Sequence, residues 1–322
     1  MAIPSLAMIP SGYKATKLYS VLPTDGVGDF TVARASTATR VNSAGLIETV
    51  GADVPRLDYS DGGCPVLLTE PQSKNEYLNS QVMVTQTVTT TADEYTVSFY
   101  GTGTIALSGT FTGSLVGTGV NDLVQLTFTA TSGGLVSTVT GNVNESQLEK
   151  LSYATSRIRT EGTTVTRVAD VVSDAGDVNT FKSSEGTLFL HAKCPDDNTN
   201  QFMGLVENTS SGDYIAIYGS GSNDKWSASV RRGADVYYFS TSGFFDKSVM
   251  SKIAVVWSGT SLTFYINGTK GNTQTILSPF PTNIFNNLTL DFSGVDFYGE
   301  TKEIQVFNTE LTEAEAITLT TL

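Results

Sequence analysis

The segment of residues 252–270, KIAVVWSGTSLTFYINGTK, constrains the fold more than any other part of the chain. Apolar and polar residues alternate along both of its halves, and this period of two predicts two strands that each bury one face. Residues 258–261 form a short loop between the strands, and Asn267-Gly268 is the pair that tight hairpin turns favour. The segment therefore predicts antiparallel β-sheet.

The same alternation recurs through residues 171–322. Further strands are expected at residues 186–194, 214–218, 226–230, 236–239 and 302–307. One short helix should close the chain, because Thr312 and Glu315 have the spacing of a capping box. A segment of about 150 residues is an ordinary size for one domain, so we expect a single β-sandwich here.

Residues 79–170 contain a second group of short strands, separated by glycine-rich turns. In the strand predicted at residues 95–100, Tyr95, Val97 and Phe99 share one face. Further strands are predicted at residues 104–107, 109–116, 123–129 and 135–139. Strands of this length between such turns are typical of a small β-sandwich.

Residues 1–78 lack a comparable pattern and are expected to form an irregular N-terminal arm. Prolines between residues 55 and 71 interrupt regular strand pairing. Arg34, Arg40 and Arg56 stand out in an otherwise acidic chain, and we predict that they lie at an anchoring or oligomerisation interface. Because the arm has no sizeable core of its own, we expect residues 1–75 to be ordered only against a partner chain.

Charge and composition exclude several classes of partner. The chain of 322 residues has 19 Lys and Arg against 32 Asp and Glu, a formal charge of −13. Nucleic acids and anionic membrane surfaces both need clustered cations, so neither is expected to bind. No apolar run approaches the ~20 residues of a membrane span, and we expect no secretory signal at the N-terminus. Cys64 and Cys194 lie far apart, and a disulfide framework is not expected.

Three runs in the N-terminal region, RASTATRVNSAGLIETV, VPRLDY and GCPVLLTEPQSKN, resemble a module found in virion proteins of tailed bacteriophages. In those proteins the module precedes domains displayed on head or tail appendages. Residues 147–158 resemble the last strand of carbohydrate-binding jelly rolls. WSGTSLTFYINGTK and EIQVFNTELTEAEAITL, both in residues 171–322, resemble the laminin-G-like, concanavalin A-like lectin/glucanase sandwich.

These resemblances imply an all-β protein with an N-terminal arm, a small jelly-roll sandwich and a C-terminal laminin-G-like sandwich. They imply a structural virion component, a fibre or decoration protein of head or tail, that adheres to host-surface glycans. It would act as a homo-oligomer, a trimer by analogy with phage fibres, docked on other virion proteins through its N-terminal region. A dedicated glycan-binding lectin is the alternative, and for the small sandwich a role as a spacer is favoured over a sugar site. A polysaccharide-degrading enzyme is the third hypothesis.

Catalytic machinery is not predicted. His191 is the only histidine, and no serine or cysteine motif accompanies it. Glucanases of the lectin fold use paired carboxylates two residues apart on one strand, and no predicted strand has such a pair; Asp291 and Asp296 do not fit that spacing. We therefore expect neither an enzyme nor a cofactor.

Two weaker binding hypotheses follow from the C-terminal domain. Asp196 and Asp197 lie in a polar loop and are candidate calcium ligands, although their spacing matches no dedicated calcium loop and a solvated loop is the alternative. Tyr237, Tyr238 and Phe239 are consecutive in a predicted strand, so at least one aromatic ring must point away from the core. Exposed rings stack on sugars or fill interfaces between subunits.

Overall fold

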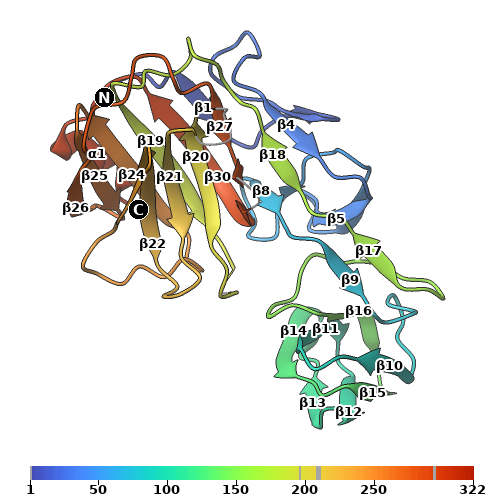
Figure 1. Ribbon diagram of the computed structural model, residues 1–322. Helices are drawn as coiled ribbons and strands as arrows, with labels where there is room; N and C mark the ends of the chain where they lie inside the picture. Colours follow the sequence, from blue (N-terminus) through green and yellow to red (C-terminus); the bar gives the residue numbers. More distant parts are fainter. Residues whose placement is uncertain (1, 196, 208–211, 293–294) are drawn as a thin grey trace.

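The computed structural model describes residues 2–195, 197–207, 212–292 and 295–322, and it confirms the all-β prediction (Figure 1). These residues form one helix, α1 (Glu313–Thr320), whose N-terminus has the predicted capping box between Thr312 and Glu315. Among them no helix is long and apolar enough to cross a membrane.

The larger β-sandwich consists of an eight-stranded and a five-stranded sheet. The eight-stranded sheet has the order β26-β25-β24-β19-β30-β8-β7, with β1 also paired to β30. Its strands are β1 (Leu6–Met8), β7 (Leu57–Asp58), β8 (Val66–Thr69), β19 (Glu185–Lys193), β24 (Ser251–Ser258), β25 (Ser261–Ile266), β26 (Thr269–Thr275) and β30 (Gly299–Phe307). The five-stranded sheet has the order β23-β22-β21-β20-β27. Its strands are β20 (Gln201–Val206), β21 (Tyr214–Gly219), β22 (Trp226–Arg232), β23 (Asp235–Phe239) and β27 (Asn287–Thr289).

The two sheets enclose one hydrophobic core. Alternate residues of each strand point into it, as with Ile253 and Val255 of β24 against Ile215 and Ile217 of β21. The predicted turn between β25 and β26 is present, and Asn267 and Gly268 have φ of 47° and 74°, the left-handed values that this two-residue turn requires.

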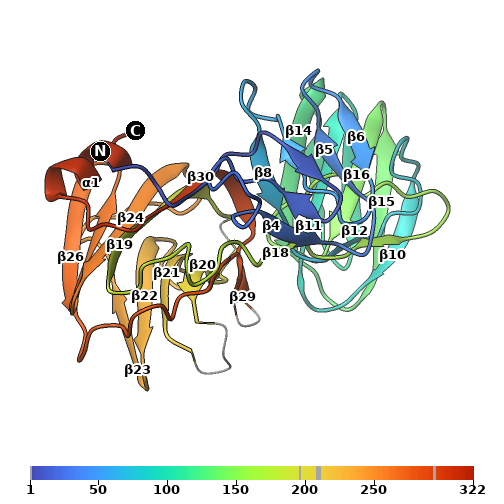
Figure 2. The ribbon, with the colours of Figure 1, turned by 90° about the horizontal axis from the view of Figure 1, so that it is seen from above.

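The outer faces of the two sheets differ. Helix α1 packs on the outer face of the eight-stranded sheet, where Ala316 joins a small apolar cluster with Phe189 and Tyr265. Figure 2 shows α1 beyond β24 and β26, on the side away from β21 and β22. The five-stranded sheet has its outer face free of any helix that the described residues form, so this face is available for other contacts.

The N-terminal residues differ from the predicted separate arm. β1 pairs with β30, with Leu6 opposite Val306, and β7 and β8 extend the same sheet. Leu6, Met8 and Phe30 are fully buried in the core of the larger sandwich. Each short apolar run of this region supplies one strand to the eight-stranded sheet. The other strands of that sheet come from residues 185–307. Residues 2–75 thus pair and pack within this chain, and the dependence of their order on a partner chain stays a prediction.

Two small sheets extend the N-terminal part. One has the order β18-β4-β3-β2, and the other is the β5–β6 hairpin. Their strands are β2 (Tyr13–Lys14), β3 (Lys17–Leu18), β4 (Phe30–Ala33), β5 (Ala38–Val41), β6 (Ile47–Val50) and β18 (Val171–Ser173). β18 follows the small sandwich in the chain and β4 precedes it. Their pairing therefore brings together the segments before and after that sandwich.

The small sandwich is an insertion on a two-stranded stem (Figure 1). Its sheets have the orders β10-β15-β12-β13 and β14-β11-β16, so the chain changes sheet at every connection except the β12–β13 hairpin. Its strands are β10 (Gln86–Thr90), β11 (Glu94–Gly101), β12 (Thr104–Gly109), β13 (Gly113–Val116), β14 (Gly119–Thr129), β15 (Gly133–Thr140) and β16 (Val143–Glu149). Tyr95, Val97 and Phe99 lie in its core as predicted. The stem pairs β9 (Ser73–Asn75) with β17 (Val165–Arg167).

Candidate functional site

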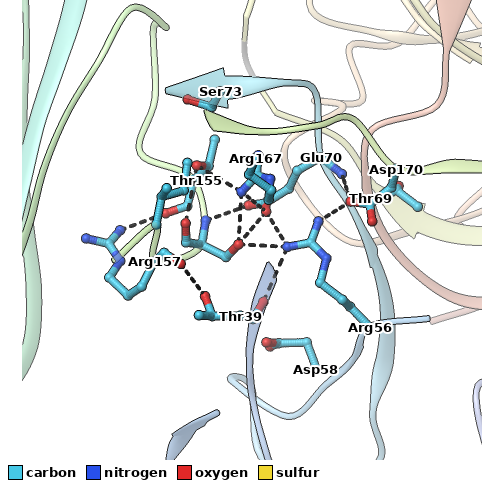
Figure 3. A network of polar contacts seen from close by, with 12 residues as sticks. Thr39, Arg56, Asp58, Thr69, Glu70, Ser73, Thr155, Arg157, Arg167 and Asp170 are labelled. Atoms are coloured by element: carbon cyan, nitrogen blue, oxygen red, sulfur yellow. Dashed lines mark hydrogen bonds and ion pairs between the residues drawn. The ribbon is translucent and has the colours of Figure 1, made fainter. Parts of the chain in front are cut away.

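A buried cluster of charges lies where the stem meets the larger sandwich (Figure 3). Arg56 binds Glu70 at 2.5 Å and also pairs with Asp170, while Arg167 binds Glu70 at 2.7 Å. Arg34 completes the cluster with a 2.8 Å contact to Asp170. Each of these residues is at most 7% exposed. We call these five residues the ionic junction.

The ionic junction keeps its carboxylates charged. Burial alone would raise the pKa of Glu70, but the guanidinium groups of Arg167 and Arg56 outweigh it and lower the pKa to about 2. Glu70 also accepts hydrogen bonds from the backbone amide and hydroxyl of Ser156, in the segment that leaves the inserted sandwich. The junction therefore holds both ends of the insertion.

The arginines predicted as an anchoring interface are internal. Arg34 and Arg56 are each 1% exposed, and internal carboxylates and carbonyls surround their guanidinium groups. Arg40 is partly buried and pairs with Glu48 at 2.7 Å and with the Tyr13 hydroxyl at 2.9 Å. An external partner would need these groups exposed, so the contacts of Arg34 and Arg56 serve the fold. Anchoring through other residues of this region stays a prediction.

Aromatic rings gather on the open outer face of the five-stranded sheet. Phe202 stacks on Tyr218 at 4.6 Å between ring centroids and on Phe292 of β28 (Asp291–Phe292) at 5.5 Å. Phe292 meets Tyr214 edge-on at 4.8 Å, and Tyr218 meets Tyr238 edge-on at 6.1 Å. We call these five residues the aromatic face.

Small residues lie beneath the rings. Gly204, Ala216 and Ser229 are neighbours across β20, β21 and β22, and the register places Tyr238 opposite Ser229. The Tyr214 hydroxyl lies 3.2 Å from the Ser229 hydroxyl, which places a polar group at the base of the face. The arrangement combines apolar ring surface with hydroxyl groups, which is the chemistry that contacts sugar rings.

Of the three consecutive aromatics predicted as a contact, only Tyr238 belongs to the aromatic face, and it is 62% exposed. Phe239 is 6% exposed in the core, and Tyr237 packs against that core with its hydroxyl accepting a bond from the Leu277 amide. The sequence reasoning missed the other four rings. Tyr214 and Tyr218 had a signal in the alternation of YIAIY, whereas the positions of Phe202 and Phe292 depend on strand order.

Two carboxylates lie beside the aromatic face. Asp291 of β28 pairs in register with Asp296 of β29 (Val295–Asp296), and Tyr298 donates a 2.7 Å hydrogen bond to Asp296. Burial first, and then the hydrogen bond and charge of Asp291, raise the pKa of Asp296 to about 6. The sequence search sought carboxylates on one strand and so did not join these two.

The calcium hypothesis concerns Asp196 and Asp197. Asp196 lies outside the described residues. The carboxylate of Asp197 binds the Lys247 ammonium at 3.2 Å and also accepts hydrogen bonds from Thr199 and Gln201. Lys247 has a fully buried side chain, so its ammonium supplies the positive charge that a metal ion would otherwise bring. No three His, Cys, Asp or Glu residues among those described are placed to hold a metal ion.

His191 lies on the outer face of the eight-stranded sheet, far from the aromatic face in the fold. Burial first, and then the charges of Lys252 and Lys302, lower the pKa of His191 to about 4. Cys64 is exposed, Cys194 is buried, and both are free. Burial raises the pKa of the Cys194 thiol, which makes it a poor nucleophile.

Comparison with known proteins places the C-terminal domain in a family. Residues 169–316 match the laminin-G-like model described as the concanavalin A-like lectin/glucanases superfamily. No curated protein matches the chain.

Solved structures resemble part of the chain. A native heptameric SAP-like pentraxin from Limulus polyphemus is 15% identical, covers 42% of this chain and 70% of its own, and has a TM-score of 0.36. The CBM40 of a Ruminococcus gnavus IT-sialidase, bound to α2,3-sialyllactose, is 16% identical over 42% of this chain and 83% of its own, with a TM-score of 0.37. Domain 4 of the arabinanase AbnA from Geobacillus stearothermophilus, in complex with arabinotriose, is 14% identical. It covers 53% of this chain and 81% of its own, with a TM-score of 0.39. Residues 169–316, which supply most strands of the two-sheet core described above, are therefore similar to concanavalin A-like lectin/glucanase domains.

Proposed function

We propose that the protein is a glycan-binding adhesion protein whose ligand lies on the aromatic face. The observation that carries the proposal is the continuous set of rings on the uncovered face of a lectin-like sandwich. Tyr238 is exposed and the other four rings are half-buried, and apolar ring surface that stays open to solvent on one face of a sheet indicates a binding surface. Stacking on sugar rings uses this apolar surface, and the exposed Tyr238 can also bind a sugar hydroxyl through its own hydroxyl.

The proposed setting is the surface of a tailed-phage particle, with the protein as a homotrimeric fibre or decoration component of head or tail. The resemblance of RASTATRVNSAGLIETV, VPRLDY and GCPVLLTEPQSKN to virion proteins supports this part of the proposal. Locating the protein on purified particles with labelled antibodies in the electron microscope tests it. Absence of label from every part of intact particles would reject the virion setting and leave the glycan-binding proposal standing.

We propose binding without cleavage. Asp291 and Asp296 are the carboxylates nearest the aromatic face among the residues discussed, and they lie on two paired strands rather than two residues apart on one strand. A hydrolase must place a sugar carbon or a water between its two carboxylates. Release of reducing ends from any glycan that the protein binds would contradict this part of the proposal.

A glycan array compares the wild-type protein with Tyr238→Ala. Tyr238 is 62% exposed, so its truncation removes ring surface without opening the core. Phe244→Ala is the matched control, because Phe244 is 61% exposed and lies outside the aromatic face. We expect Tyr238→Ala to weaken binding about tenfold or more, which corresponds to ~1.4 kcal/mol, and the control to bind as the wild type does. Equal binding by both variants would reject the aromatic face as the site.

A further inference from the structure

A groove separates the inserted sandwich from the larger one. It consists of two adjoining hollows of about 210 and 220 Å³ on either side of Ala154. Leu68, Glu70, Ala154 and Glu300 line both hollows, so the two lie side by side. The first is also lined by Tyr153, Lys193 and Ser248, and the second by Arg40, Ser60, Tyr100 and Leu123. We call this space the junction groove.

The charges around the junction groove are balanced. Three cationic and three anionic side chains line it: Arg40, Arg157 and Lys193, and Asp58, Glu70 and Glu300. Lys193 and Glu300 are paired at 3.0 Å, and Arg40 is paired with Glu48. Since neither sign is in excess, the groove has no net attraction for a strongly charged ligand. A neutral ligand suits it better.

Polar atoms without protein partners point to what the ligand offers. The Tyr153 hydroxyl and Nη1 of Arg40 are buried and have no hydrogen-bond partner among the described residues. Oε2 of Glu300 is buried and has only the Lys193 ion pair. Buried polar atoms are almost always satisfied by protein, water or ligand, because an unpaired one has lost its hydrogen bond to water. Tyr153, Arg40 and Glu300 all line the groove, so a small movement of these side chains would present two donors and one acceptor to a ligand that carries hydroxyl groups.

Apolar surface completes the groove. Leu68 lies on its floor, and Tyr100 and Leu123 supply apolar surface from the inserted sandwich. Each hollow is smaller than the ~300–1,000 Å³ of a pocket for a drug-sized ligand, so each would take one ring-sized unit. Mixed hydroxyl partners and apolar walls of this size fit the polar edges and apolar faces of a sugar ring.

We propose that the junction groove binds a neutral, hydroxyl-rich ligand of one or two rings, a neutral monosaccharide or disaccharide unit. The site is formed jointly by residues from the inserted sandwich and from the larger one. It is separate from the aromatic face and does not depend on it. The inserted sandwich then contributes to recognition in addition to any role as a spacer.

Saturation-transfer difference NMR on the full-length chain tests the proposal with glucose, galactose, mannose, N-acetylglucosamine, lactose and maltose as probes. Leu123→Trp places a large ring in the groove from a position that is 44% exposed, so the fold should tolerate it. Val120→Trp is the matched control, because Val120 lies on the same strand, is 60% exposed and does not line the groove. We expect at least one probe to bind the wild type and the control, and to bind Leu123→Trp at least tenfold more weakly.

Each other outcome overturns the proposal. Binding of none of these probes, or equal binding by Leu123→Trp and the wild type, rejects the groove as a sugar site. Binding of glucuronic acid alone rejects a neutral ligand. The variant Tyr238→Ala separates the two sites, because it should leave groove binding unchanged. Loss of binding in Tyr238→Ala together with normal binding by Leu123→Trp would assign the ligand to the aromatic face and leave the groove without one.

Discussion

The substitution Glu70→Gln tests whether the ionic junction stabilises the fold. It keeps the size of the side chain and removes the charge that faces Arg56 and Arg167. Both guanidinium groups then lose a buried partner, and breaking a buried ion pair from one side costs about 3–5 kcal/mol. The pKa of Glu70 gives a second value for the loss of unfolding free energy in this variant. Its fall from 4.5 to about 2 corresponds to roughly 3 kcal/mol, at about 1.4 kcal/mol per pKa unit.

The pH dependence of this effect has a defined sign. A carboxylate whose pKa is lower in the folded state than in the unfolded state stabilises the fold above the unfolded value. The contribution of Glu70 is therefore complete above about pH 4.5 and disappears as the pH falls towards 2. Glutamine does not titrate, so the difference between the wild type and Glu70→Gln should fall to half or less by about pH 3.

Urea denaturation at pH 7 and at pH 3 measures both expectations. The control is Glu185→Gln, which removes one carboxylate from the exposed pair with Lys182 and should change the free energy of unfolding by no more than about 1 kcal/mol. The reasoning fails if Glu70→Gln lowers the free energy of unfolding at pH 7 by as little as this control does. It also fails if Glu70→Gln lowers the free energy of unfolding equally at both pH values.

Three further predictions concern the larger sandwich. Lys247→Met should lower the free energy of unfolding by about 3–5 kcal/mol in urea denaturation, because it leaves the largely buried carboxylate of Asp197 without its ammonium; an unchanged midpoint would contradict this. The raised pKa of Asp296 in the folded state makes the fold less stable as the pH rises from about 4 to 6. Asp296→Asn should reduce this loss of stability, and melting temperatures across that pH range measure it. Thr312→Ala should cost about 1 kcal/mol by removing the helix cap, and thermal denaturation that matches the wild type would refute the capping role.

Local patterns were sufficient to predict many of the strands and turns, although strands such as β10, β20 and β27 were not predicted. Tyr95, Val97 and Phe99 alternate with polar residues and lie in a core, and Asn267-Gly268 forms the predicted turn. These predictions hold because each depends on neighbouring residues only. Most of the strand ends also fall within a few residues of the predicted bounds, since turns are determined locally by glycine, asparagine and proline.

Long-range pairing was not predictable in this way. Leu6 lies opposite Val306, and Arg34 reaches Asp170 across 136 positions of sequence. Nothing in a three-residue strand or a single arginine identifies such a partner, so the N-terminal region was predicted to be a loose arm with exposed arginines. The same limit applies to the aromatic face, because Phe202 and Phe292 meet only after β20 and the β28–β29 hairpin have been placed.

The ionic junction assigns a structural role to the three N-terminal runs RASTATRVNSAGLIETV, VPRLDY and GCPVLLTEPQSKN. Arg34 in RASTATRV, Arg56 in VPRLDY and Glu70 in LLTEPQSKN all contact residues beyond the insertion. Asn75, the last residue of these runs, donates to the carbonyls of Ser146 and Ile158 at 3.0 and 2.8 Å. Because these contacts are buried and directional, they fix how the inserted sandwich sits on its stem. These runs thus specify how the inserted domain is seated, and in the proposed virion setting the docking surface would be formed by other, exposed residues.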